Sequence, residues 1–217
     1  MNKTWKKLVV ILPVFILTCF FVRARFKEEY SHSSSLRIFG LFLCILLLYV
    51  WIVFLVIRKK QETSRQVLLQ SGFFVYVFMV LTLTGYFILF KEISSHDWWD
   101  KMRHRVEIRD KVNLTAFKTM KIYKPFDKQI VGNVVMLLPL ALFIPLLFQR
   151  IRKFLPVVGL CFLTSLMIEL MQLVTSYRST DVDDVILNTA GACIGFLIYK
   201  LFEKQFDYIS KPPLSSS

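Results

Sequence analysis

The sequence predicts an all-α fold, a polytopic integral membrane bundle of about six transmembrane helices. Hydrophobic residues fill 55% of its 217 positions and include 21 Phe, an apolar share that soluble domains of this length rarely reach. They fall into runs near the roughly 20 residues that a membrane-spanning helix needs. The formal net charge of +13 lies mainly in short segments between the runs, as expected of anchors that face lipid headgroups. We therefore expect membrane lipids, and not nucleic acid, as partners.

Six apolar runs give the predicted spans, which are residues 8–22, 38–57, 67–90, 130–148, 154–175 and 185–202. The first run is short, and Val22-Arg23-Ala24 after it resembles a signal-peptide cleavage site. Because arginines flank that site, we expect an uncleaved span instead. All four cysteines lie inside apolar runs without metal-type spacing, so we expect no disulfide, no metal site and no cofactor.

Short basic loops predict the orientation of the chain in a cell membrane. RKKQETSR at 58–65 and QRIRK at 149–153 are expected in the cytoplasm together with the N-terminus and the C-terminus. The turn 176–184 and the long loop 91–129 are then expected on the outer side. We divide the chain into an N-terminal two-span region, a membrane domain and a polar tail, which are residues 1–66, 67–202 and 203–217. The sequence does not predict an oligomeric state.

The loop 91–129 carries features of a membrane interface. Trp98 and Trp99 near its start suit an interfacial aromatic belt. Later in the loop, at 106–123, apolar residues recur at helical spacing, so a helix lying on the membrane surface is one interpretation. A plain solvated loop is the other, and the sequence does not decide between them.

Polar residues inside the fifth predicted span need an explanation. Glu169 and Gln172 are three residues apart and share a helix face with Ser165. A charged carboxylate at mid-membrane costs about 2.5–3.5 kcal/mol, and less near the interface. Glu169 is therefore expected to be paired, protonated or facing water. Either it clamps two helices together or it lines a functional cleft, and we favour the cleft.

The turn before the sixth span is acidic. Thr180-Asp181-Val182-Asp183 resembles a capping box with Asp in its last place. Asp183 and Asp184 then fall in the first helical turn, where negative charge suits the positive end of the helix dipole. This placement explains both carboxylates without any function.

A single stripe along the sixth span holds Asp184, Asn188, Gly191 and Gly195 at spacings of four, three and four. The two glycines form a small-xxx-small pair that lets another helix approach closely. Because the polar groups share the stripe with this packing seam, Asp184 and Asn188 are predicted to point into the bundle and not toward lipid.

The fourth span begins with IVGNVVMLLP, which places Asn133 one turn inside and Pro139 just past the middle. Asn133 is explained either by an interhelical hydrogen bond or by a place in the cleft, and Pro139 is expected to loosen the helix. Span four starts, span five ends and span six starts on one side, so the polar groups share one half of the bilayer, predicted to be the outer half. The candidate ligand-binding residues are Asn133, Glu169, Gln172, Arg178, Asp181, Asp184 and Asn188.

These residues in this order resemble a known family, the VanZ-like membrane proteins. The resemblance covers about residues 67–202 and is carried by N-L-x-x-F-x-T at 113–119, Gly132-Asn133, Pro139, E-x-x-Q at 169–172, R-x-x-D-x-D-D at 178–184 and N-T-x-G at 188–191. Ala141 departs from the Gly usual two residues after the proline. The resemblance implies an integral membrane protein and a link to glycopeptide tolerance of the teicoplanin type, but no assigned chemistry.

Two functions of different classes follow. In the first, a non-catalytic protein binds an envelope component or an amphiphile, with Arg178 holding an anionic group through its forked donors. In the second, a membrane-embedded enzyme acts on a lipid-linked or glycan substrate, with Glu169, Asp181, Asp183 and Asp184 around a divalent cation. Binding is favoured, because the sequence presents no nucleophile with an adjacent base.

Overall fold

The structure is a computed structural model that describes residues 12, 15, 19, 64–86, 97–108, 112–122, 126–175 and 179–210. The predicted spans 8–22 and 38–57 lie outside the described residues, apart from three isolated positions. Contacts divide the chain into two compact units, one of Met1–Met79 with Lys204–Ser217 and one of Val80–Glu203. Every candidate ligand-binding residue belongs to the second unit, which is therefore described in most detail.

Helix α3, Ser64–Leu83, is the first long described helix and corresponds to the third predicted span. The helix ends at Leu83, where a turn at Thr84 and Gly85 follows, and residues 87–90 of the predicted span 67–90 lie outside the described residues. Gly85 adopts a left-handed backbone with φ of 77°, a conformation that ends helices at little cost for glycine. The hydroxyl of Thr84 donates to the carbonyl of Val80 at 2.8 Å and so closes the last turn.

Three helices of the described chain are long and apolar enough to cross a membrane. They are α7 (Lys128–Leu147), α8 (Phe154–Val174) and α9 (Val182–Leu201), and they confirm the last three predicted spans as helices. The prediction of six spans is not decided by the described residues. Helix α7 runs continuously through Pro139 and Pro145.

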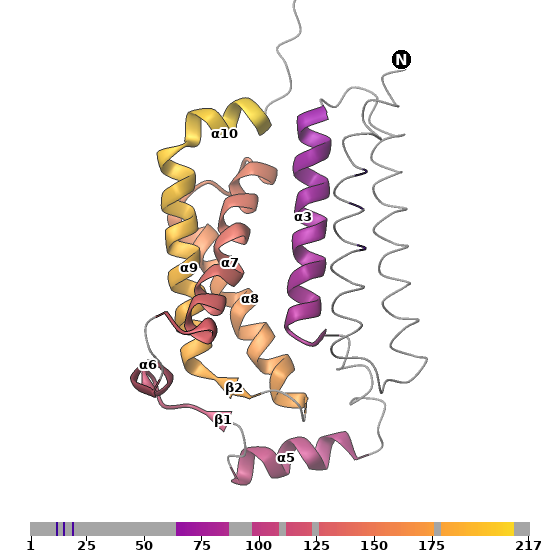
Figure 1. The fold of residues 1–217 in the computed structure, drawn as a ribbon, viewed down its shortest axis with the longest axis vertical. Coiled ribbons are helices and arrows are strands. Elements are labelled where there is room, and N and C mark those ends of the chain that lie inside the picture. Colours follow the sequence, from indigo (N-terminus) through magenta and orange to yellow (C-terminus); the bar gives the residue numbers. More distant parts are fainter. Residues whose placement is uncertain are drawn as a thin grey trace, which may run out of the picture. The chain divides into compact units, whose positions relative to one another are not determined.

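Helix α9 packs against both α7 and α8; the three are the yellow, salmon and orange ribbons of Figure 1. Gly191 lies directly on the carbonyl of Val134, and Gly195 lies on the carbonyl of Leu138. This arrangement confirms the predicted small-residue seam and names its partner, α7. Among the described residues of the bundle, the fully buried apolar side chains include Leu137, Ala141, Pro145, Val157, Cys161, Ala192 and Tyr199.

The segment before α7 folds against one end of the bundle (Figure 1). It consists of helix α5 (Trp98–Ile108), strand β1 (Val112–Asn113) and helix α6 (Lys118–Ile122). Strand β1 pairs in parallel with β2, Thr180–Asp181, which immediately precedes α9. A single helix over residues 106–123 does not form, because Val112 and Asn113 are extended and paired, while α5 ends at Ile108 and α6 begins at Lys118. Helical spacing was present in the sequence, but pairing with β2 determines the local structure. After α9, helix α10 covers Glu203–Ser210.

Candidate functional site

Glu169 joins the end of α8 to the start of α9. Its side chain is 4% exposed, and its Oε2 accepts a hydrogen bond from the backbone N–H of Asp181 at 2.9 Å. Its backbone carbonyl accepts a longer bond, 3.5 Å, from the Thr180 hydroxyl. The predicted alternative of a clamp therefore describes at least one contact that this carboxylate makes.

Asp181 is the residue at which three segments meet. Its Oδ1 accepts from the backbone N–H of Asp183 at 2.9 Å, which makes Asp181 the N-cap of α9. The same oxygen accepts from Nδ2 of Asn113 at 2.9 Å, across the β1–β2 pair. The predicted capping box is thus displaced by one residue, because Thr180 is held in strand β2 and Asp181 takes the cap position.

Asp183 is fully buried and holds the segment after β1. Its Oδ1 accepts from the backbone N–H of Phe117 at 2.5 Å. Phe117 has a φ of 63°, a left-handed conformation that is rare for a bulky residue. The helix-dipole explanation from the sequence therefore accounts for only part of the role of Asp183, which also fixes a chain reversal at Phe117.

Asp184 and Asn133 connect the first turns of α9 and α7. Nδ2 of Asn133 donates to Oδ1 of Asp184, and both side chains are half-buried. This contact confirms that α7 and α9 begin at the same end of the bundle. The placement of Asp183 and Asp184 in the first turn of α9 is confirmed as well, where the helix dipole stabilises their charge.

Asn188 lies deeper in the bundle than the other polar residues of α9. Its Nδ2 donates to the hydroxyl oxygen of Ser165 on α8 at 2.8 Å, and both residues are fully buried. Its Oδ1 is buried and has no hydrogen-bond donor among the described residues. Gln172, on the same face of α8 as Ser165, is 8% exposed, and its backbone carbonyl accepts from the Thr175 hydroxyl at 3.0 Å.

Arg105 on α5 is a residue of this end that sequence reasoning missed. Its side chain is buried, and Nη1 donates to the carbonyl of Leu173 at 2.9 Å and also to the carbonyl of Thr175. These carbonyls belong to the last turn of α8, where backbone acceptors lack helical donors. The positive guanidinium also suits the negative end of the helix dipole. Its partner lies about 70 residues away, beyond the reach of any local pattern.

Six of the seven candidate residues are described, and they gather at the end where α7 and α9 start. Arg178 lies outside the described residues. Four of the six are less than a tenth exposed, namely Glu169, Gln172, Asp181 and Asn188. The candidate site is therefore a tightly packed network in this structure. Asn113, Phe117 and Asp183 also join the network. The sequence marked Asn113 and Phe117 as motif residues and Asp183 as a candidate cation ligand, but it did not place them among the predicted ligand-binding residues.

No three His, Cys, Asp or Glu side chains within the described part of the chain are placed to hold a metal ion. The carboxylates of Glu169, Asp181 and Asp183 instead accept hydrogen bonds from backbone N–H groups and from an asparagine amide. The interpretation as a metal-dependent enzyme is therefore not favoured by these contacts.

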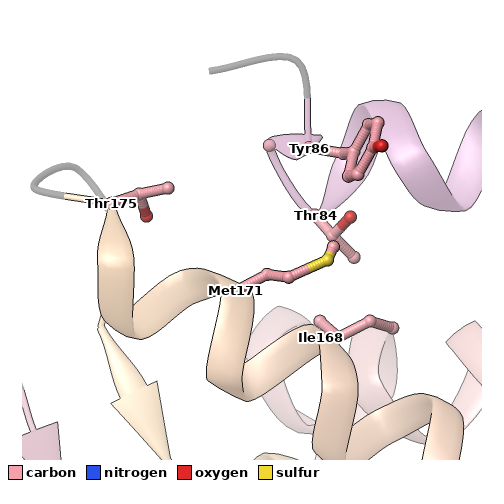
Figure 2. Close-up of a pocket in the computed structure, with 6 residues that line it drawn as sticks. Thr84, Tyr86, Ile168, Met171 and Thr175 are labelled. Atoms are coloured by element: carbon pink, nitrogen blue, oxygen red, sulfur yellow. The ribbon is translucent and has the colours of Figure 1, made fainter. Parts of the chain in front are cut away.

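A small pocket lies beside the network, on the neighbouring face of α8 (Figure 2). Its walls come from that face and from the turn after α3; the lining residues are Thr84, Gly85, Tyr86, Ile168, Met171 and Thr175. The Met171 side chain extends toward Thr84 in Figure 2. The hydroxyls of Thr84 and Thr175 lie among apolar lining groups. Such a lining can bind a mostly apolar molecule that carries one polar atom.

Apolar helices of membrane-crossing length, joined at one end by carboxylates and amides, define an integral membrane protein with a polar cluster. The chain belongs to the VanZ/LLP1 family, whose family model matches residues 39–203. That range begins upstream of residue 67, where the motif resemblance starts. Protein VanZ from Enterococcus faecium is 30% identical over 96 residues, which are 44% of this chain and 56% of that protein. The match thus spans just over half of that relative. No solved structure matches the chain.

Proposed function

We propose that the polar cluster at the start of α7 and α9 binds an envelope component or an amphiphile, and that this binding contributes to glycopeptide tolerance of the teicoplanin type. In this proposal the chain is multi-pass with both termini in the cytoplasm, and the cluster lies in the outer half of the bilayer. The observation that carries the proposal is the convergence of Asn133, Glu169, Asp181 and Asp184 at one end of three membrane-length helices.

Carboxylate chemistry indicates the kind of ligand. An ionised carboxylate accepts about four hydrogen bonds, so Glu169, Asp181 and Asp184 can each share an oxygen with a further donor. A head group rich in hydroxyl or ammonium groups supplies such donors, and charge-assisted bonds are about twice as strong as neutral ones. The small pocket beside α8 offers apolar walls for an adjoining part of the same ligand.

Arg178 is assigned the anionic part of the ligand. It lies in the three-residue connection between Thr175, the C-cap of α8, and Ser179, which precedes β2. Both ends of this connection are fixed, by the bonds of Arg105 to α8 and of Asp181 to Glu169. A guanidinium binds a phosphate or carboxylate through paired donors, which a lysine in the same place does not reproduce.

A susceptibility assay tests the proposal in cells. A sensitive host carries empty vector, wild type, Glu169→Gln or the control Glu203→Gln, whose carboxylate lies at the opposite end of α9 and pairs with Lys200. Wild type and the control are expected to raise teicoplanin tolerance at equal membrane protein levels, and Glu169→Gln is expected to lose the effect. Wild type that behaves like empty vector overturns the link to tolerance.

A binding assay separates ligand recognition from tolerance. Purified protein is unfolded thermally in detergent with teicoplanin or with a lipid-linked cell-wall precursor as the probe. A ligand present at about 100 times its Kd stabilises the folded state by about 2.7 kcal/mol. Arg178→Ala is expected to remove this stabilisation with no product formed. Turnover of the probe that stops in Asp184→Asn supports the enzyme alternative instead.

A further inference from the structure

Four large apolar side chains in the described part of 114–126 are exposed, although they belong to none of the long helices. The exposed fractions are 71% for Leu114, 53% for Phe117, 66% for Ile122 and 91% for Phe126. Exposed apolar residues that stand singly need no explanation, but several within so short a stretch mark an interaction surface. We name these four residues the apolar anchor.

The hydrogen bonds of the network fix the level of the apolar anchor along the bundle. Phe117 is bonded through its backbone N–H to Asp183, and Asn113 is bonded to Asp181. Helix α6 contacts α9, and the chain enters α7 at Lys128, directly after Phe126 and its neighbour Asp127. Figure 1 shows α6 near the start of α9. These contacts place the apolar anchor at the depth where α7 and α9 begin, which is the boundary between apolar and polar surroundings for helices of membrane-crossing length.

Charge around the apolar anchor is positive. Residues 114–128 contain four lysines and one aspartate, and that aspartate, Asp127, is engaged as the N-cap of α7. Lys118, Lys121 and Lys128 are exposed. Apolar side chains combined with exposed lysines are typical of segments that insert shallowly among anionic headgroups. Lysine stems extend along apolar surface while the ammonium group reaches the phosphates.

We propose that the apolar anchor inserts into the headgroup layer, at the end of the bundle that holds the polar cluster, and that Lys118, Lys121 and Lys128 select anionic phospholipids. The bonds of Phe117 to Asp183 and of Asn113 to Asp181 thereby hold the start of α9 at one level of the lipid surface. This inference does not require that the polar cluster binds a ligand.

Fluorescence quenching tests where Phe126 lies. An environment-sensitive dye is attached to Phe126→Cys in full-length protein in nanodiscs, with the native cysteines replaced by alanine; these are Cys19, Cys44, Cys161 and Cys193. We expect quenching by a phospholipid with a shallow nitroxide and protection from aqueous iodide. The same dye at Thr115→Cys serves as the matched control, because Thr115 is an exposed polar residue next to Leu114 of the apolar anchor. Its fluorescence is expected to be quenched more strongly by iodide.

Two results overturn the insertion. Quenching of the Phe126 dye by iodide alone places the residue in water. Shielding from both quenchers, with the control dye responding normally, places it against protein, either a second copy or another chain. Retained folding of each labelled protein is checked by its thermal unfolding midpoint, so that a misfolded variant is excluded before quenching is compared.

A second measurement tests the selection of anionic lipid. Phosphatidylglycerol and phosphatidylcholine with nitroxides at the same acyl position are compared in mixed nanodiscs, and the ratio of their quenching reports local enrichment. Lys118→Gln with Lys121→Gln is expected to lower the preference for the anionic lipid by up to about fivefold per lysine removed. Lys200→Gln at the other end of α9 is expected to leave the ratio unchanged. A ratio that is equal in wild type and the double variant refutes the selection.

Discussion

Glu169 of α8 accepts a hydrogen bond from the backbone N–H of Asp181, the residue that caps α9. A buried carboxylate is thereby placed at the N-terminal end of a helix, where unpaired N–H groups and the helix dipole favour negative charge. Asp181 follows the connection 176–178 that contains Arg178, and the bond holds the chain on that side of the connection to α8. The sequence left two roles open for Glu169, a clamp between helices or a wall of a cleft. The structure shows the clamp, and this contact lies where a ligand is proposed to bind.

Replacement of Glu169 by Gln tests this bond. The amide keeps the shape of the side chain and one acceptor oxygen but removes the charge. Because hydrogen bonds to charged groups stabilise by about 1.5–3 kcal/mol and neutral ones by about 0.5–1.5, we expect a loss of about 1 kcal/mol in the free energy of unfolding. Thermal unfolding in detergent measures it, and Glu203→Gln, whose salt bridge is solvent-exposed, should lose about 0.5 kcal/mol or less. Equal losses in both variants contradict the assignment.

The seam between α7 and α9 gives a second prediction. A methyl group on Gly191 collides with the carbonyl of Val134, a backbone atom that moves only with its helix. Gly191→Ala is expected to destabilise the protein by roughly 1–3 kcal/mol, as overpacking of a close contact does.

Gly132→Ala is the matched control for that substitution. No atom lies within 4 Å of a Cβ built at this helical glycine, and alanine in a helix interior is favoured over glycine by roughly 0.5–1 kcal/mol. We expect unchanged or raised stability in this variant. Chemical unfolding in mixed micelles compares the two, and a tolerated Gly191→Ala shows that α7 and α9 separate easily.

The sequence predicted the helices from the length of their apolar runs and the seam from residue spacing, and both are local properties of the sequence. The stripe of Asp184, Asn188, Gly191 and Gly195 follows from helix geometry alone, and the contact of Asn133 with Asp184 follows from the ends at which the helices begin. Which helix the glycines contact did not follow, because nothing along α9 distinguishes α7 from α8 as a partner.

Contacts from the loop were beyond prediction for a different reason. Asn113, Phe117 and Arg105 bond to residues about 70 positions later through backbone groups or through a helix N-cap. Such long-range contacts depend on how the loop folds back onto the bundle. The local sequence of the loop does not show which distant residues it will contact. The sequence left a surface helix and a solvated loop open at 106–123, and the pairing of Val112 and Asn113 with β2 excludes a single continuous helix there.

The attachment of α5 to α8 gives a third prediction. Arg105→Ala removes the donor to the carbonyls of Leu173 and Thr175 and leaves these acceptors to water. Hydrogen–deuterium exchange of residues 98–108 is expected to rise, because these bonds attach the helix to the end of α8. Arg103→Ala, an exposed position on the same helix, should exchange as wild type does. Unchanged exchange in Arg105→Ala contradicts the proposed attachment.

The buried pair of Ser165 and Asn188 gives a fourth prediction, in the form of a double-mutant cycle. Ser165→Ala deprives the Asn188 amide of its acceptor, and the other end of that amide already has no donor among the described residues. A buried polar group without partners costs about 1–3 kcal/mol, so this variant should be clearly destabilised. Asn188→Leu removes the amide but keeps its branched shape, and the Ser165 hydroxyl can turn to the carbonyl of Cys161 one helical turn back.

The double variant Ser165→Ala with Asn188→Leu buries no unpaired side-chain group at this position. Its stability should therefore exceed that of Ser165→Ala alone, with a coupling of about 0.6 kcal/mol and at most about 1.7, the range found for interhelical hydrogen bonds in membranes. Unfolding of all four proteins in bicelles measures the coupling. Simple addition of the two single losses shows that the bond carries no stabilising free energy. In that case the amide of Asn188 has a role other than stability. If Asn188→Leu also abolishes the thermal stabilisation by teicoplanin or the lipid-linked precursor, that role is ligand binding.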